Sequence, residues 1–308
     1  MRAFIFPGQG SQAVGMGAAL AEASRSARDV FDEVDEALGQ NLFKLMREGP
    51  DEDLKLTENA QPAIMAHSIA VLRTMGIQLA DVADFAAGHS LGEYSALCAA
   101  GSFDLATTAK LLKLRGQAMQ QAVPVGQGAM AALLGADLTL AQKIADAAAE
   151  GEVCTVANDN DPSQVVISGS KAAIDRAIAL AKDLGAKRAV PLPVSAPFHC
   201  PLMQPAAEAM RDALSYVVVG KPAVPIFANV SAQPETDPDI IRNQLVDQVT
   251  GMVRWRESVS NMFDAGAHQF VEIGGKVLGS MVKRIVPDAQ VTSIVTIEDV
   301  EALIKEIA

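Results

Sequence analysis

One serine of this chain stands in a context typical of a catalytic nucleophile. The segment GHSLG, residues 88–92, follows a predicted short strand at residues 83–87 and precedes a helical pattern. In this G-x-S-x-G pattern, the glycines permit a sharp strand-to-helix turn that projects the hydroxyl of Ser90. The backbone N–H of Leu91 would open the helix and could stabilise an oxyanion. The alternative is a glycine-rich turn in which Ser90 only caps the helix.

A serine nucleophile needs a general base, and the chain contains four histidines. His199 is the best candidate, because it lies in an irregular loop that leads into a helix, whose positive dipole end favours the neutral imidazole. His89 lies inside the motif, and its side chain is expected to point away from Ser90. His67 lies in an apolar helical pattern and is expected to be a buried core histidine. His268 is left as the alternative base.

A charged residue interrupts the apolar stripe of a predicted helix at residues 104–121. Arg115 falls on the same helical face as Leu112 and the other apolar residues of this segment. A guanidinium on a buried face needs an anionic partner. Two interpretations are open: an internal salt bridge or snorkelling side chain, and a bidentate clamp for a substrate carboxylate.

A second glycine-rich segment, GQGSQA at residues 8–13, follows the predicted first strand at residues 3–6. It loosely matches a dinucleotide-binding fingerprint. That fingerprint requires a second strand ending in an acid about twenty residues later, whereas residues 26–38 have the pattern of a charged helix. No cofactor is therefore expected. The glycines could instead place Gln9 beside Ser90, as part of an oxyanion hole.

Short apolar runs alternate with longer helical patterns, which predicts an α/β fold. The first half of the chain is expected to hold strands at 3–6 and 83–87 and helices at 27–38, 60–75, 91–100 and 104–121. After residue 196, the expected elements are a helix following Pro201, strands near 226–228 and 269–272, and a closing helix at 299–307.

The segment from residue 124 to residue 196 has a different organisation. Its predicted order is β-α-β-β-α-β, the ferredoxin-like pattern, with strands at 129–134, 153–157, 164–168 and 188–192 and helices at 139–149 and 171–184. We therefore predict a discontinuous large α/β domain, residues 1–123 and 197–308, with an inserted ferredoxin-like small domain, residues 124–196.

Composition narrows the classes of function. The 308 residues include 25 Lys+Arg and 37 Asp+Glu, a net charge of −12. An acidic surface repels a phosphate backbone, so nucleic-acid binding is not expected. The three cysteines form no CxxC pair, which predicts no metal site and fits a reducing compartment. Because neither a signal peptide nor a membrane-spanning run is recognisable, we expect a cytoplasmic protein that does not bind membranes.

Taken together, the motifs resemble the malonyl-CoA:acyl carrier protein transacylase family of bacterial fatty acid synthesis. The resemblance covers essentially the whole chain in the right order. It is carried by FPGQGSQ at 6–12, GHSLGEY at 88–94, LRG at 114–116, SAPFH at 195–199, VRW at 253–255 after Gln248, and EIG at 272–274.

The resemblance implies a hydrolase-like large domain with a parallel sheet and a nucleophile elbow. It implies malonyl-CoA and acyl carrier protein as substrates, with Ser90 as the nucleophile, His199 as its base and Arg115 as the ligand of the malonyl carboxylate. The malonyl group would be held as an ester on Ser90 and then transferred to the pantetheine thiol of the carrier protein, which is a ping-pong mechanism.

The same resemblance implies supporting roles for three further residues. The main-chain carbonyl of Gln248 would orient His199. Gln9 would support the oxyanion hole, together with the backbone N–H of Leu91.

Three other functions are considered. A serine esterase or thioesterase could use Ser90 with His268, although this leaves Arg115 and the Gln9 loop unexplained. A polyketide-pathway acyltransferase would use the same residues, and a non-catalytic carrier-binding module would tolerate their loss. An acidic carrier protein would need a local basic patch, for which the candidates are Lys182, Lys187, Arg188, Lys276, Lys283 and Arg284.

Overall fold

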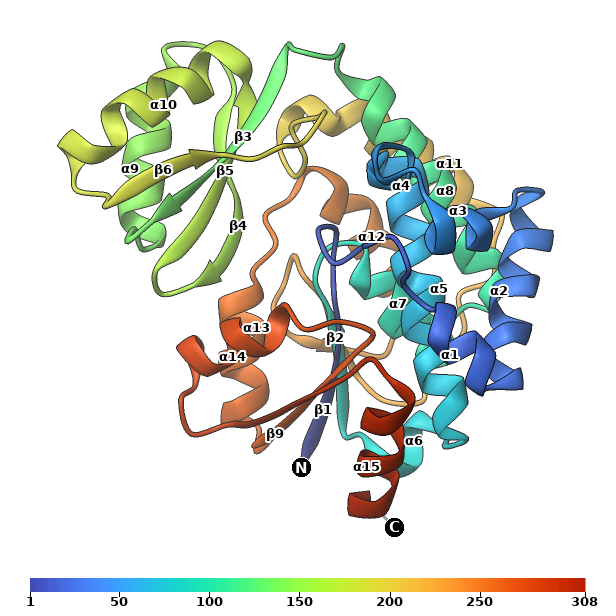
Figure 1. Cartoon of the computed structure of the whole chain (residues 1–308). Coiled ribbons are helices and arrows are strands. Elements are labelled where there is room, and N and C mark those ends of the chain that lie inside the picture. The colour runs from blue at the N-terminus through green and yellow to red at the C-terminus, as the bar shows by residue number, and fades with distance from the viewer. Residues whose placement is uncertain (308) are drawn as a thin grey trace.

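The strands of this computed structural model, which describes residues 1–307, form two separate sheets (Figure 1). The larger sheet has six strands in the order β10-β9-β1-β2-β7-β8. Its strands are β1 (Arg2–Phe6), β2 (Phe85–Gly88), β7 (Ile226–Phe227), β8 (Pro234–Glu235), β9 (Gln269–Ile273) and β10 (Gln290–Ile294).

The strands of the larger sheet run parallel from β10 to β7, and only β8 pairs antiparallel. In register, Phe6 at the end of β1 lies beside Gly88 at the end of β2. Because parallel strands end at one edge of a sheet, the loop after β1 and the turn after β2 are brought together. The motifs that contain Gln9 and Ser90 therefore meet at the carboxyl edge.

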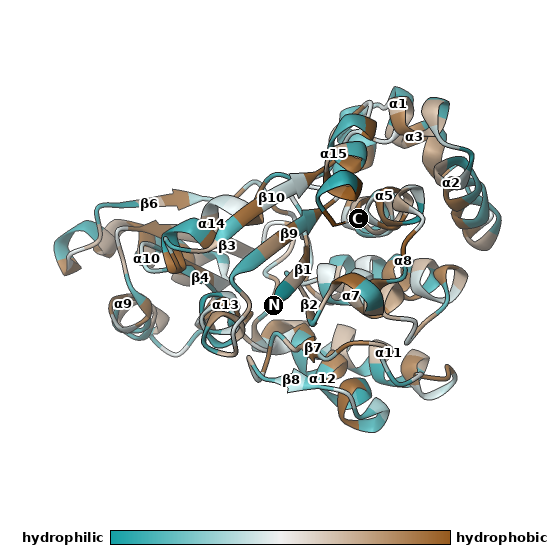
Figure 2. Ribbon diagram, turned by 90° about the horizontal axis from the view of Figure 1, so that it is seen from below, coloured by the Kyte–Doolittle hydropathy of each residue, from teal (hydrophilic) through white to brown (hydrophobic). Residues whose placement is uncertain are grey.

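Side chains of β1 alternate between two apolar cores, one on each face of the larger sheet. Phe4 and Phe6 pack with the buried residues of α5 (Thr57–Met75) and α7 (Gly92–Ala99). Ala3 and Ile5 pack on the other face, with α13 (Trp255–Asp264) and α14 (Leu278–Ile285). Figure 2 shows these two pairs of helices on opposite sides of β1, β2 and β9.

The remaining helices outside the small sheet surround these layers. They are α1 (Ala18–Ala23), α2 (Arg25–Leu38), α3 (Leu42–Glu48), α4 (Asp51–Lys55), α6 (Leu79–Val82), α8 (Leu105–Ala122), the 3-10 turn Pro201–Met203, α11 (Gln204–Ser215), α12 (Pro238–Thr250) and α15 (Ile297–Ile307). No helix in residues 1–307 is long and apolar enough to cross a membrane.

The smaller sheet is antiparallel throughout, in the order β4-β5-β3-β6. One of its faces is covered by two helices (Figure 1), and residues of the other face, such as Ala132 and Val166, join the apolar core that contains Phe4 and Phe6 of β1. Along the chain its elements are β3 (Gly128–Leu134), α9 (Leu138–Ala149), β4 (Cys154–Asp161), β5 (Gln164–Ser170), α10 (Lys171–Leu184) and β6 (Arg188–Pro191).

Strand β4 of the smaller sheet contacts α13 and α14, which pack against the larger sheet. The buried carboxylate of Asp159 accepts hydrogen bonds from Arg256 of α13, and that of Asp161 accepts one from Arg284 of α14 at 2.8 Å. The backbone of β4 also bonds to Val253, two residues before α13. Hydrogen bonds and ion pairs therefore hold one strand of the smaller sheet against two helices that pack on the larger sheet.

Several elements have no counterpart in the sequence-based prediction, among them β10, α12 and α13. Strand β10 lies at the edge of the sheet, where only every second residue approaches the core, and its sequence QVTSI is largely polar. Helix α12 has an apolar stripe at Ile241, Leu245 and Val249, but the sequence-based prediction did not include it. Their positions depend on pairing and packing with distant segments, which a local pattern does not contain.

Candidate active site

The backbone around Ser90 forms a sharp turn at the carboxyl end of β2. Strand β2 ends at Gly88, helix α7 begins at Gly92, and Ser90 between them has a φ of 54°. A Cβ on Gly88 would lie 1.9 Å from the backbone of Gly92, so only glycine permits this approach. The positive φ of Ser90 is a rare conformation for a residue with a side chain, and such strain concentrates at functional sites.

Asn229, in the loop after β7, holds this turn in place. Its side-chain oxygen accepts the backbone N–H of Ser90 at 2.8 Å, and its side-chain nitrogen donates to the carbonyl of Gly88 at 2.7 Å. Asn229 is 1% exposed, so these bonds form away from water. They compensate part of the strain in the turn.

The hydroxyl of Ser90 faces His199. The distance between Ser90 Oγ and His199 Nε2 is 2.8 Å, and His199 Nδ1 lies 2.8 Å from the main-chain carbonyl of Gln248. A carbonyl only accepts, so the proton of the neutral ring is on Nδ1 and Nε2 is free to take one from Ser90. The side chain of His199 is therefore oriented as a base toward the hydroxyl.

Burial and the nearby charge of Arg115 lower the pKa of His199 to about 3. The imidazole is thus neutral throughout the physiological range and ready to accept a proton. The sequence predicts that a helix dipole keeps His199 neutral. In the structure burial is the main cause, because His199 is 3% exposed.

Arg115 of α8 also reaches the hydroxyl of Ser90. Its guanidinium donates to Gln61 Oε1 at 2.8 Å, to Gln248 Oε1 at 2.9 Å and to Ser90 Oγ at 3.2 Å. Arg115 is 1% exposed, and its buried Nε has no hydrogen-bond partner. Within residues 1–307, no carboxylate oxygen lies within 4.0 Å of it. The internal salt bridge considered from the sequence is therefore wrong.

Gln9 and the backbone of Leu91 lie at the same edge of the sheet. The loop that holds Gln9 packs against the turn, because a Cβ on Gly8 would lie 2.6 Å from the carbonyl of His89. Gln9 is partly exposed, and its Nε2 donates to Thr57 at 3.4 Å. The N–H of Leu91, just before α7, finds no acceptor in the described part of the chain. It remains available to a ligand.

The other three histidines contact residues other than Ser90. The ring of His89 bonds through Nε2 to Asn160 at 2.8 Å, and buried His67 lies with Nδ1 3.2 Å from the carbonyl of Gly274. His268 precedes β9, at the amino edge of the parallel sheet, and packs against the ring of Phe263. The structure thus pairs Ser90 with His199, and His268 lies at the opposite edge.

Four residues near the site were assigned no role from the sequence: Gln61, Glu93, Asn160 and Asn229. Glu93 carried a signal, since it is the only charged residue of the largely apolar helix α7 and follows the G-x-S-x-G motif directly. The three amides carried none, because an amide disturbs no hydrophobic pattern and can equally be a surface residue.

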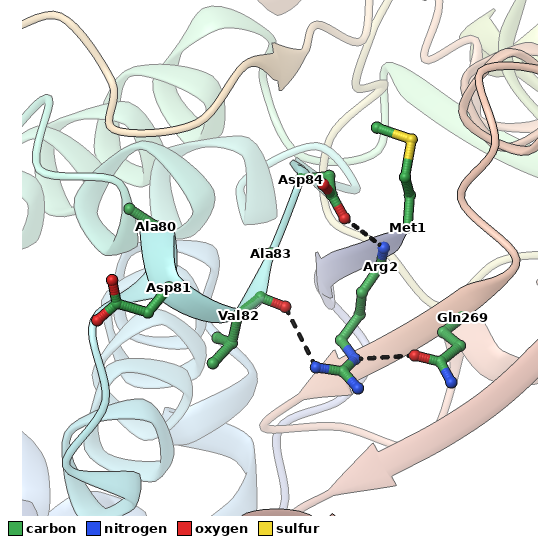
Figure 3. Close-up of a pocket in the computed structure, with 8 residues that line it drawn as sticks. All are labelled: Met1, Arg2, Ala80, Asp81, Val82, Ala83, Asp84 and Gln269. Carbon is green, nitrogen blue, oxygen red and sulfur yellow. Dashed lines mark hydrogen bonds between the residues drawn. The ribbon is translucent and has the colours of Figure 1, made fainter. Parts of the chain in front are cut away.

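Two hollows of the surface lie outside this constellation. One, of about 290 Å³, is formed at the amino edge of the larger sheet (Figure 3), where Arg2 already donates to Val82, Gln269 and Asp84. The second, of about 760 Å³, lies between α9, β4 and Met252. None of the residues predicted for the site lines either hollow. In the described residues, no cluster of His, Cys, Asp or Glu could hold a metal ion.

Comparisons with known proteins agree with these observations. The family model described as "Acyl transferase domain" matches residues 3–290. The malonyl CoA-acyl carrier protein transacylases of Escherichia coli K12 and Bacillus subtilis 168 are each 46% identical to the chain, over 92% of it and over 92% and 90% of their own lengths.

Solved structures give the same result. The acyl-carrier-protein S-malonyltransferase of Bartonella henselae superposes with a TM-score of 0.97 at 51% identity, covering 100% of this chain and 99% of its own. A malonyl-transacylase solved with its type II polyketide acyl-carrier protein has a TM-score of 0.96 at 40% identity, covering 99% of each chain. With the α/β fold and mixed sheet of these enzymes, the chain belongs to the acyl transferase family, among the malonyl CoA-acyl carrier protein transacylases.

Proposed function

We propose that this protein transfers the malonyl group of malonyl-CoA to the pantetheine thiol of acyl carrier protein, through a malonyl ester on Ser90. The observation that carries this function is the convergence of two groups on one hydroxyl. His199 Nε2 lies 2.8 Å and Arg115 Nη2 lies 3.2 Å from Ser90 Oγ. A nucleophile with both a base and a free buried cation fits a substrate that has a thioester at one end and a carboxylate at the other.

In the first half-reaction, Ser90 Oγ attacks the thioester carbonyl while its proton moves to His199 Nε2. The tetrahedral oxyanion is stabilised by the N–H of Leu91 and by the Gln9 segment, and such donors contribute about 3 kcal/mol each in well-studied enzymes. The C–S bond then breaks and the proton on His199 passes to the sulfur of CoA. Malonyl-Ser90 remains, and His199 is neutral again.

In the second half-reaction, the carrier's thiol gives its proton to His199 and attacks the ester carbonyl of malonyl-Ser90. Collapse of this intermediate breaks the C–O bond, and His199 returns the proton to Ser90 Oγ. The bond between His199 Nδ1 and the Gln248 carbonyl keeps the ring in position for both transfers. The exchange is balanced: one thioester is consumed and one is formed.

Arg115 provides the selectivity for a malonyl group. Its Nε has no partner, and its nearest acceptors are neutral amides and a hydroxyl, so its charge is available to the malonyl carboxylate. An acetyl group offers no such carboxylate and leaves the buried guanidinium without an anion, which is costly. We therefore expect malonyl-CoA to be strongly preferred over acetyl-CoA.

The domain organisation belongs to the same proposal. Residues 1–123 and 197–308 form a hydrolase-like large domain in which the turn at Ser90 is the nucleophile elbow, as its glycines and positive φ support. Residues 124–196 form a ferredoxin-like insertion, supported by the β-α-β-β-α-β order and the strand order β4-β5-β3-β6.

We assign the reaction to fatty acid biosynthesis in the cytoplasm, which the free cysteines suit. One structural relative, however, is described with a type II polyketide carrier, so a polyketide-pathway acyltransferase is the second candidate. The chemistry is the same in both, and the carrier that accepts the malonyl group fastest distinguishes them.

The proposal is tested by intact-protein mass spectrometry after brief mixing with malonyl-CoA, without carrier protein. We expect one malonyl adduct on the wild type and none on Ser90→Ala. Arg115→Ala should lose the malonyl adduct but gain an acetyl adduct from acetyl-CoA. Free malonate and CoA without any adduct would instead identify the protein as a hydrolase and overturn the proposal.

A further inference from the structure

The buried carboxyl of Glu93 is separated from Arg115 by the side chain of Gln248, which bonds to both. Glu93, in the first turn of α7, is 2% exposed. Its Oε2 accepts the side-chain N–H of Gln248 at 2.7 Å and the backbone N–H of Asn229 at 3.0 Å. Burial raises the pKa of Glu93 to about 7. Burying a carboxyl costs free energy, and neither half-reaction uses Glu93.

The contacts of Gln248 show what this carboxyl does. The side-chain nitrogen of Gln248 donates to Glu93 and to the carbonyl of Ser90 at 3.0 Å, while its oxygen accepts from Arg115 at 2.9 Å. Turning the amide by half a rotation would exchange nitrogen and oxygen. Its N–H groups would then face the guanidinium, donor against donor, and an oxygen would face Glu93. The accepting oxygen of Glu93 excludes that orientation.

We propose that Glu93 is a positioning residue for substrate selection: through Gln248 it aims Arg115 at the site of the malonyl carboxylate. A carboxylate in direct contact with Arg115 would neutralise the guanidinium and occupy the place of the substrate. With the Gln248 amide between them, Arg115 is oriented by a neutral oxygen and its charge stays free. This inference rests on the proposed function, because it takes Arg115 as the ligand of the malonyl group.

Two substitutions at position 93 separate positioning from a general structural role. Both hydrogen bonds fall on the same oxygen of Glu93, so the single carbonyl oxygen of Glu93→Gln can accept both. Glu93→Ala removes both. Loss of the bond to Asn229, which holds the turn at Ser90, should slow malonyl and acetyl transfer alike. Loss of the bond to Gln248 should in addition raise KM for malonyl-CoA about tenfold, an effect that acetyl transfer does not share because acetyl has no carboxylate for Arg115. Glu93→Gln should recover most of the loss.

Gln248→Met gives an independent test of the route. It removes the amide but keeps the main-chain carbonyl that binds His199. Because the lost contact with the Ser90 carbonyl affects both acyl groups, the quantity compared is the malonyl effect relative to the acetyl effect. We expect KM for malonyl-CoA to rise beyond any loss shared with acetyl transfer, and no further rise when Glu93→Ala is added, because the two residues act in series. Circular dichroism melting of each variant shows that it is folded.

Three results would overturn the inference: an unchanged KM in Gln248→Met, equal losses for malonyl and acetyl transfer, or additive losses in the double variant. Gln248→Met decides the matter even where Glu93→Ala does not fold. Failure of the proposed function itself is distinguishable, because the wild type would then form no malonyl adduct at all.

Discussion

The two sheets of this protein contribute to the site in different ways. The larger sheet is mostly parallel, so the ends of β1 and β2 bring the Gln9 loop and Ser90 to one edge. The smaller sheet is antiparallel, and its strands alternate in direction. From the smaller sheet, β4 supplies one polar contact to the GHSLG turn, between Asn160 and His89.

The two sheets therefore separate the reacting groups from the contacts that hold the sheets together. Parallel strands collect functional groups at their carboxyl ends, whereas strand β4 presents Asn160 toward the motif and its neighbours Asp159 and Asp161 toward two arginines. Changes at the carboxyl edge of the larger sheet should therefore affect the reaction, and changes at the contacts of β4 with α13 and α14 should first affect stability. Four predictions test this division.

The largest effect is expected for His199→Ala. Without a base at 2.8 Å from Ser90 Oγ, the rate of malonyl-Ser90 formation should fall by roughly a thousandfold. Quenched-flow mass spectrometry with malonyl-CoA measures this rate. His268→Ala is the matched control and should react like the wild type, because His268 lies at the opposite edge of the sheet. A comparable loss in the control would contradict the assignment of the base.

Arg256→Met should lower stability and leave the chemistry nearly intact. The carboxylate of Asp159, 3% exposed, would lose its ion pair. Because Arg256 is itself partly exposed, we expect the free energy of unfolding to fall by about 2 kcal/mol rather than by the larger cost of a fully buried pair. Urea denaturation measures the change.

The control for this variant is Arg73→Met, which breaks an exposed pair with Glu33. It should cost less than about 0.5 kcal/mol. Equal losses in the two variants would mean that the contact between β4 and α13 is no more important than a surface ion pair.

The pH dependence of acylation should be weak on the acid side. Because the pKa of His199 is lowered to about 3, the base stays neutral as the pH falls. From about pH 7.5 to about 5.5, we expect less than a twofold change in the acylation rate, whereas a histidine of pKa about 6.5 would lose roughly tenfold of its neutral form.

Glu93 titrates within this range, since burial raises its pKa to about 7. A proton on Oε1 leaves Oε2 free to accept both of its hydrogen bonds, so its protonation should add little. Stopped-flow release of CoA at several pH values measures the profile. A tenfold loss that persists in Glu93→Gln would show that His199 titrates normally.

The smallest effect is expected at the surface. Lys187, just before β6, and Lys283, on α14, are exposed and form no ion pair with the described residues, unlike Arg284, which binds Asp161. If both domains contact an acidic carrier protein, Lys187→Glu and Lys283→Glu should each raise KM for the carrier about threefold and spare KM for malonyl-CoA.

Lys44→Glu, on α3, is the matched control for this charge reversal, because Lys44 is also exposed. It should leave both KM values unchanged. A rise for only one of the two test residues would assign carrier docking to a single domain. No rise for either would remove both residues from the docking surface.

Much of the site could be predicted because its signals are local. The glycines of GHSLG indicate a tight turn, and Arg115 is a charged residue within the apolar stripe of α8. Glu93 was visible as a charge in an apolar helix, but its role was not, because its partners Gln248 and Asn229 are 155 and 136 residues away in the chain.

The βα turn that carries Ser90 and the alternation of strands and helices could be predicted from the amino-acid sequence, because each depends on neighbours along the chain. The folded chain was needed to show that His199 rather than His268 meets Ser90, that Arg115 has no internal carboxylate partner, and that Gln248 lies between Arg115 and Glu93. These are contacts between distant segments. They arise from the packing of sheets and helices, in which burial and hydrogen bonding select one arrangement that no local pattern encodes.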